Sequence, residues 1–175
     1  MASPTGCGPS MEWPLTIVSG GQTGADRAAL DFAIRFGLDH AGWCPLGRRA
    51  EDGPLDLQYN LQESSSAKYD QRTRWNVRDS DATLVITAQA NATGGSALTL
   101  AVAERAGKPC LHLAQEETPS VIEAGERIAD FILEHRVERL NVAGPRASQE
   151  PEIGTYVAAV LSAALTSEAF SQSDQ

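Results

Sequence analysis

Three short segments combine glycines with hydrogen-bond donors directly after an apolar run, which is a pattern typical of anion binding in α/β proteins. The first segment contains Gly20, Gly21, Gln22, Thr23 and Gly24. Its glycines allow backbone N–H groups to approach a ligand without an intervening Cβ, and the helix predicted to follow adds free N–H donors. The pattern is neither a P-loop nor GxGxxG, so it specifies no nucleotide. The alternative is a tight turn before a capped helix.

The second segment follows a predicted strand that ends at Thr87, and it also leads into a helix. Its polar and glycine residues are Thr93, Gly94, Gly95 and Ser96. Thr93 and Ser96 can cap the helix and donate hydrogen bonds, so a simple capped helix is the alternative. Two such loops at strand ends of one parallel sheet would lie at the same edge, which favours binding.

The third segment, residues 144–148, places Arg146 directly beyond a strand end. The planar guanidinium group suits a phosphate or another oxyanion, because it donates two parallel hydrogen bonds. The alternative is a surface arginine paired with Glu150 or Glu152.

A long segment rich in Pro, Gly, Asp and Ser, residues 45–66, carries further positive charge. Arg48 lies in it, and Arg72 and Asn76 follow on one face of the next predicted helix. Arginines beside an aromatic residue suit a lid over an anionic, planar ligand. A solvated basic face is the alternative.

Strands alternating with helices must position these loops. The patterns predict strands at 15–19, 40–44, 82–87, 109–113 and 139–143, and helices at 25–36, 67–78, 95–106, 119–135 and 151–165. This order predicts an α/β fold: a Rossmann-like doubly wound, mainly parallel sheet with helices on both faces. Ligands bind such sheets at the carboxyl ends of the strands. We expect one domain over 14–165, between flexible tails at 1–13 and 166–175.

Composition narrows the possible partners. The chain has 175 residues and a formal net charge of −9, which disfavours nucleic acid and anionic membranes. We expect no membrane span, since no apolar run approaches the roughly 18–20 residues that one needs, and no secretory signal. The 3 cysteines form no CxxC pair, which indicates reduced thiols in a cytoplasmic protein. No metal site is predicted, and Cys44 is expected to be a buried, inert thiol.

Five motifs in order give the chain a family resemblance. They are SGGQTGADRAALDFA (19–33), GWCPLGRRAEDG (42–53), KYDQRTRWNVRDSDATLVI (68–86), TGGSALTL (93–100) and NVAGPRAS (141–148). Together they resemble the molybdenum-carrier family, over nearly all of the chain outside the tails. That family belongs to a Rossmann-like group that includes the lonely-guy phosphoribohydrolases and the DNA-processing protein DprA.

The resemblance implies a carrier that binds and protects the molybdenum cofactor, a pterin dithiolene with a phosphate and a molybdenum-oxo group. The ligand contacts that it implies are Gly20, Gly21, Gln22, Thr23, Gly24, Thr93, Gly94, Gly95, Ser96 and Arg146, with Arg48, Arg72 and Asn76 as further candidates. Molybdoenzymes or cofactor-synthesis proteins are then expected partners. Apolar helix faces at 95–107 and 119–135 favour a homo-oligomer.

An enzyme remains the competing hypothesis. The hydrolases of the wider group have a glutamate close to a PGGxGTxxE-like loop, but here TGGSALTLAVAE (93–104) places Glu104 further along the helix. Carboxylate-assisted cleavage needs the acid within about 3 Å of its target, directly or through water. The sequence therefore favours a carrier, with a nucleotide-binding sensor or a nucleoside-monophosphate N-glycosidase as alternatives.

Overall fold

The chain folds around one parallel β-sheet, seen in a computed structural model that describes residues 14–171. Its strands are β1 (Thr16–Val18), β2 (Asp39–Ala41), β7 (Ala82–Thr87), β8 (Cys110–Ala114) and β9 (Arg139–Ala143). They lie in the order β2-β1-β9-β7-β8, and every adjacent pair is parallel. The last strand in the chain, β9, is therefore the central one.

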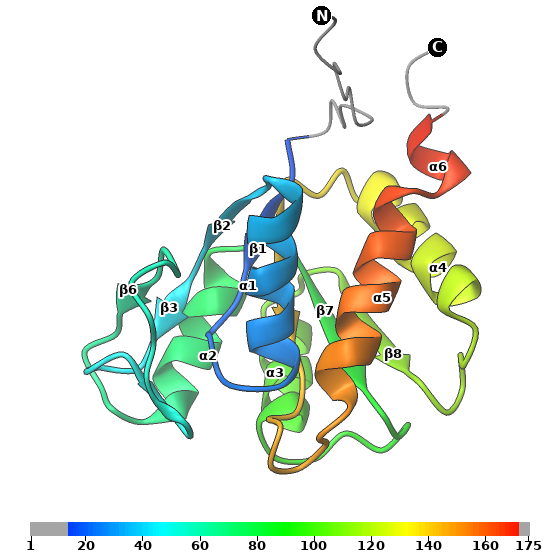
Figure 1. Ribbon diagram of the computed structural model, residues 1–175. Coiled ribbons are helices and arrows are strands. Elements are labelled where there is room, and N and C mark those ends of the chain that lie inside the picture. Colours follow the sequence, from blue (N-terminus) through cyan, green and yellow to red (C-terminus); the bar gives the residue numbers. More distant parts are fainter. Residues whose placement is uncertain (1–13, 172–175) are drawn as a thin grey trace, which may run out of the picture.

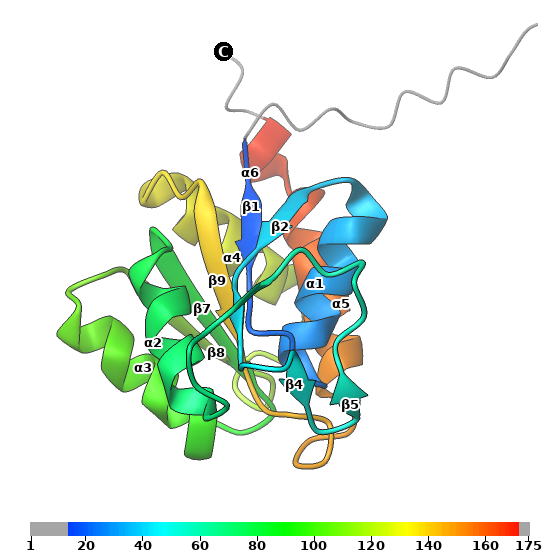
Figure 2. The ribbon, with the colours of Figure 1, turned by 90° about the vertical axis from the view of Figure 1, so that its left-hand side faces the viewer.

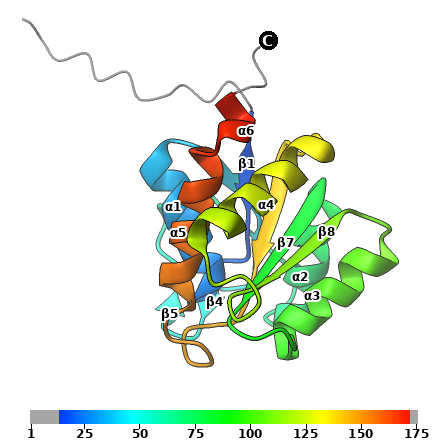
Figure 3. The same cartoon turned by 90° about the vertical axis from the view of Figure 1, so that its right-hand side faces the viewer.

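Helices cover both faces of this sheet (Figures 1 and 3). One face carries α1 (Ala25–Phe36), α4 (Val121–Glu134) and α5 (Ile153–Leu165), while the other carries α2 (Tyr69–Arg78) and α3 (Gly94–Arg105). This arrangement confirms the predicted Rossmann-like α/β fold.

The two faces differ in how they are packed. The main apolar core lies between the sheet and α1, α4 and α5, where Ile17, Leu84 and Leu140 meet helix residues such as Ile128 and Val157. On the other face, α2 buries Asn76 and Val77, and α3 buries Ser96, Thr99 and Ala103. The α2–α3 face is therefore the more polar one.

The 45–66 segment, which was predicted as a lid, contains short strands. It contains β4 (Arg49–Ala50) paired antiparallel with β5 (Gly53–Pro54), and β6 (Gln62–Glu63) paired with β3 (Trp43–Cys44). A separate small core of Leu30, Cys44, Ala50, Leu55, Tyr59 and Leu61 joins it to α1. Apolar packing therefore fixes the segment against the body of the protein.

The prediction of a single strand at 40–44 was correct only in part. The segment splits into β2 and β3, which belong to different sheets, and Gly42 lies between them with φ 140°. A Cβ at Gly42 would collide with the carbonyl oxygen of Ser19, so the chain turns where no other residue fits. Alternation of side chains along 40–44 gives no sign of this break.

The ends of the chain need two corrections. A four-residue helix, α6 (Glu168–Ser171), lies within the predicted C-terminal tail, whereas the predicted tail at 1–13 lies outside the described residues. By length and composition, Ile153–Phe170 is apolar enough to cross a membrane, contrary to the expectation of no such run. Its α5 part buries Ile153, Val157 and Val160 in the main core, and a core helix meets the same criterion.

Candidate anion-binding site

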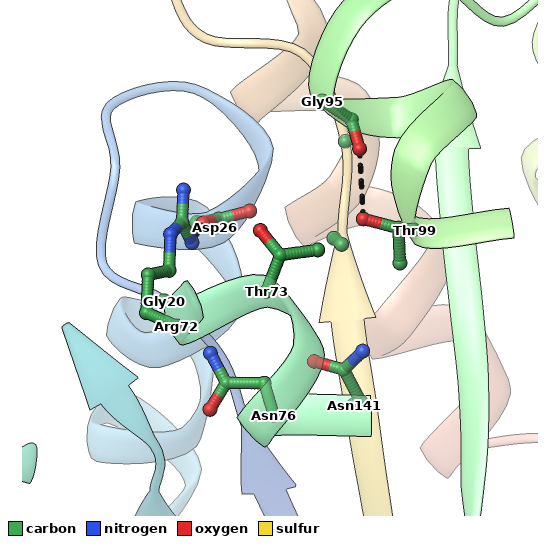
Figure 4. Close-up of a pocket in the computed structure, with 10 residues that line it drawn as sticks. Gly20, Asp26, Arg72, Thr73, Asn76, Gly95, Thr99 and Asn141 are labelled. Atoms are coloured by element: carbon green, nitrogen blue, oxygen red, sulfur yellow. Dashed lines mark hydrogen bonds and ion pairs between the residues drawn. The ribbon is translucent and has the colours of Figure 1, made fainter. Parts of the chain in front are cut away.

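The predicted loops meet at the carboxyl edge of the sheet, around a small cavity of about 40 Å³ (Figure 4). Strand ends and helix α1 contribute Gly20, Asp26, Asn141, Ala143 and Gly144, while α2 and α3 contribute Arg72, Thr73, Asn76, Gly95 and Thr99. The cavity thus brings together residues of all three predicted loops and of α2, the helix that carries Arg72. Its volume suits one small anionic group, with the rest of a larger ligand outside.

A buried ion pair forms one wall of the cavity. Arg72 Nη1 donates to Asp26 Oδ2 over 2.6 Å, and the two side chains are 12% and 4% exposed. The guanidinium lies directly over Gly20, where a Cβ would collide with it. Arg72 Nε is buried and has no hydrogen-bond partner among the described residues. One donor of this arginine therefore remains available to an acceptor that enters the cavity.

Three arginines surround the ring of Tyr69 at the start of α2. The guanidinium carbons of Arg146, Arg72 and Arg49 lie 5.2, 5.7 and 5.8 Å from the ring centroid. Within residues 14–171, neither Arg49 nor Arg146 forms a salt bridge. An acidic protein thus concentrates positive charge beside the cavity. The candidate contacts named from the sequence did not include Arg49 and Tyr69, although both lie within the family motifs.

Arg146 does not form the ion pair with Glu150 that was the alternative prediction. Glu150 Oε2 instead accepts a 2.8 Å hydrogen bond from the backbone N–H of Ala88, which joins the loop after β9 to the loop after β7. The Arg146 side chain lies over Tyr69. The structure therefore brings Arg146 together with Arg72.

The amino end of α3 is open. Thr93 is its N-cap residue but forms no side-chain cap, and the N–H groups of Gly94, Gly95 and Ser96 donate to no acceptor in the described part of the chain. A Cβ at Gly95 would meet nothing within 4 Å. Free N–H groups and the helix dipole stabilise a bound anion at such a position.

Several donors at the amino end of α1 are occupied by other protein groups. Gln22 Oε1 accepts from the Thr23 N–H, the Ala25 N–H donates to the Pro145 carbonyl, and the Ala147 N–H donates to the Thr23 hydroxyl. Gly24, with φ 80°, lies so close to Pro145 that a Cβ would collide with its carbonyl oxygen. Close packing therefore requires a glycine at position 24 whether or not a ligand binds.

Gly21 has a similar reason for being glycine. Its φ is 78°, and a Cβ would collide with the side chains of Leu55 and Leu61. Gly21 therefore packs against the 45–66 segment.

Arg48 and Asn76 hold the chain in place. Arg48 lies in the left-handed region, with φ 53°, and donates to the carbonyls of Leu55, Asp56, Tyr59 and Leu61. Its guanidinium organises the 45–66 segment and does not line the cavity.

Asn76 lines the cavity, but both polar atoms of its amide bind the backbone of Trp43. It joins α2 to β3.

Burial raises the pKa of the neighbouring Cys44 thiol, which keeps it protonated.

Residues 17–165 match the circularly permutated YpsA SLOG family. The chain belongs to this family. The sheet order agrees with the permutation: counted from β9 and then from β1 onward, the strands follow the common doubly wound order 3-2-1-4-5. In that order the ligand crevice lies where the order reverses, here between β9 and β7, beside the open end of α3.

A solved structure supports the same assignment. It is the crystal structure of a protein from Syntrophus aciditrophicus SB that is provisionally named a molybdenum carrier protein. The two chains are 45% identical with a TM-score of 0.85, and the match covers 88% of this chain and 96% of that one. No match was found among curated proteins. Among the described residues, no group of three His, Cys, Asp or Glu side chains could hold a metal ion.

Proposed function

We propose that this protein binds and carries the molybdenum cofactor, with the cofactor's phosphate at the open amino end of α3. One observation carries the proposal: Gly94, Gly95 and Ser96 present N–H groups without a protein acceptor, and Gly95 shares a cavity with Arg72. The 45% identity to a protein named as a molybdenum carrier supports this choice of phosphate-bearing ligand.

The size of the cavity suggests how the ligand lies. A volume of about 40 Å³ admits a phosphate group but not a pterin. The planar part of the cofactor would then lie outside, near Tyr69 and the arginines around it. A flat, polar, anionic group is a suitable neighbour for an aromatic ring and for guanidinium planes.

The number of donors is sufficient for useful affinity. Hydrogen bonds to charged groups contribute about 1.5–3 kcal/mol each. A micromolar complex needs about −8 kcal/mol net, after the cost of association. Three backbone N–H groups, Arg72 Nε and the Arg146 guanidinium could supply this.

Nucleotide-binding and N-glycosidase functions use the same phosphate contacts, so they remain the alternatives. Asp26 is the carboxylate that lines the cavity, and its Oδ2 accepts from Arg72. An acid held in an ion pair is poorly placed to donate or accept a proton at a glycosidic bond.

The test is to count molybdenum atoms per chain after incubation with released cofactor and desalting. The proposal expects near-stoichiometric metal, and none from molybdate alone at the same concentration. Absence of retained metal would reject the carrier function. Release of free base from a nucleoside monophosphate would then support the glycosidase, and stable binding without turnover would support the sensor.

Arg146→Ala tests the site itself. Its side chain makes no salt bridge among residues 14–171, so the free energy of unfolding should change little. Cofactor binding should weaken by about 1.5 kcal/mol or more, measured by equilibrium titration. Arg74→Ala, on an exposed position of α2, is the matched control. Equal affinities in the two variants would remove Arg146 from the site.

A further inference from the structure

The tip of the β4–β5 hairpin inserts a carboxylate between two strand-end loops. Glu51 accepts hydrogen bonds from the Thr23 hydroxyl, from the Ser148 N–H at 3.2 Å and from the Ser148 hydroxyl at 2.6 Å. Figure 2 shows this hairpin beside the amino end of α1 and the loop that leads to α5. We refer to these three donors as the Thr23–Ser148 site.

The Thr23–Ser148 site has the donor set of an anion-binding site. All three donors belong to the loops after β1 and β9, and only the acceptor comes from the hairpin. The two hydroxyl hydrogen bonds lower the pKa of Glu51, and the positive charge of Arg146 adds to the effect. The site therefore stabilises a negative charge, whichever molecule supplies it.

A buried donor beside the site lacks a partner. Gln22 is 6% exposed, and its Oε1 accepts from the Glu51 N–H at 2.9 Å. Its Nε2 is buried and, among residues 14–171, has no hydrogen-bond partner. Native proteins rarely leave such a group unsatisfied, so an additional acceptor is expected here.

The side-chain contacts that hold the hairpin tip are exposed. Glu51 and Asp52 are both exposed, and Asp52 forms a two-bond pair with Arg27 at 3.0 and 3.1 Å. Exposed ion pairs contribute little to stability, so the tip can leave at small cost while Ala50 and Leu55 stay packed in the small core.

From this geometry we infer that the Thr23–Ser148 site is a second oxyanion subsite, for a phosphate or a molybdenum-oxo group, and that Glu51 occupies it when no ligand is bound. This inference rests on the proposed function in one respect: it assigns a second anionic group of the same ligand to the site. Glu51 then competes with the ligand, and binding moves the hairpin tip away from α1.

Inorganic phosphate is the probe, titrated calorimetrically into full-length variants. Glu51→Ala should bind phosphate about two- to fivefold more tightly than wild type, because the competing carboxylate is gone. Glu126→Ala, which removes the same charge from an exposed position on α4, should behave as wild type. Adding Ser148→Ala to Glu51→Ala should abolish the gain.

The inference fails if Glu51→Ala and wild type bind phosphate equally, or if the gain survives Ser148→Ala. Glu51→Gln, which keeps the shape but not the charge, replaces the alanine variant if the hairpin is disturbed. Molybdenum retention separates the two proposals. A phosphate gain without any retained cofactor would support the subsite and reject the carrier. Retained cofactor without a phosphate gain would do the reverse.

Discussion

The amino ends of α1 and α3 carry similar sequences but differ in how many of their donors the protein itself occupies. Both follow strand ends, and both contain glycines with Thr. At α1, the N–H groups of Thr23, Ala25 and Arg27 and the Thr23 hydroxyl donate to residues of the surrounding loops and to Glu51. At α3, no acceptor within the described residues reaches the N–H groups of Gly94, Gly95 and Ser96. A glycine-rich loop before a helix therefore indicates either a tight internal junction or an anion site, and its neighbours decide which.

The largest expected effect comes from the ion pair that joins Asp26 of α1 to Arg72 of α2. Arg72→Ala leaves the Asp26 carboxylate, 4% exposed, without its partner. Removing one partner of a buried pair costs about 3–5 kcal/mol, so the free energy of unfolding should fall by that order in denaturant titrations. The double variant Arg72→Ala with Asp26→Ala should recover much of the loss. A single variant as stable as wild type would show that the pair is not buried in solution.

Gly24→Ala should have the next largest effect on the free energy of unfolding. It places a Cβ at φ 80° against the Pro145 carbonyl, so the junction of the α1 loop must shift. Strain of this kind costs about 1–3 kcal/mol. Thermal and denaturant unfolding would measure it, and a neutral result would mean that the α1 loop is as open as the α3 loop.

Gly95→Ala is the corresponding change at α3, and it should change the free energy of unfolding in the opposite direction. The Cβ meets no atom within 4 Å, and alanine favours a helix over glycine. The variant should therefore be more stable by about 0.5–1 kcal/mol, yet bind the cofactor more weakly because the methyl group occupies the open space. Unchanged binding would contradict a phosphate at this helix end.

The smallest effect concerns pH. Hydrogen bonds from Ser148 and Thr23 lower the pKa of Glu51 below 4.5, and Arg27 lowers the pKa of Asp52 below 3.8. Groups with lowered pKa values stabilise the fold above their unfolded pKa, and this contribution is lost as pH falls through the folded pKa. Both groups are exposed, so the loss should be a few tenths of a kcal/mol. The difference in unfolding free energy between wild type and Glu51→Gln should shrink below about pH 4. If the difference did not change with pH, the stability that the Glu51 contacts contribute would not depend on the ionisation of Glu51.

Much of the framework followed from the sequence because it depends on local periodicity. Helix α1 and strands β7 and β9 have the predicted bounds, since their apolar spacing and the glycines after α1 and β9 act over a few residues. The prediction failed at Gly42, where contact with Ser19 imposes the turn. It also gave Arg48 a ligand contact, although four carbonyls of its own segment bind the guanidinium.

The sequence by itself determined the order of the main helices and of the strands of the large sheet, the family and the loops that reach the carboxyl edge of that sheet. Only the tertiary structure decided which helix end stays open, which arginines gather around Tyr69 and which donors Glu51 occupies. The physical reason is distance along the chain. Ala147 binds Thr23 across 124 positions and Ser148 binds Glu51 across 97, and no local pattern of residue types encodes contacts of that range.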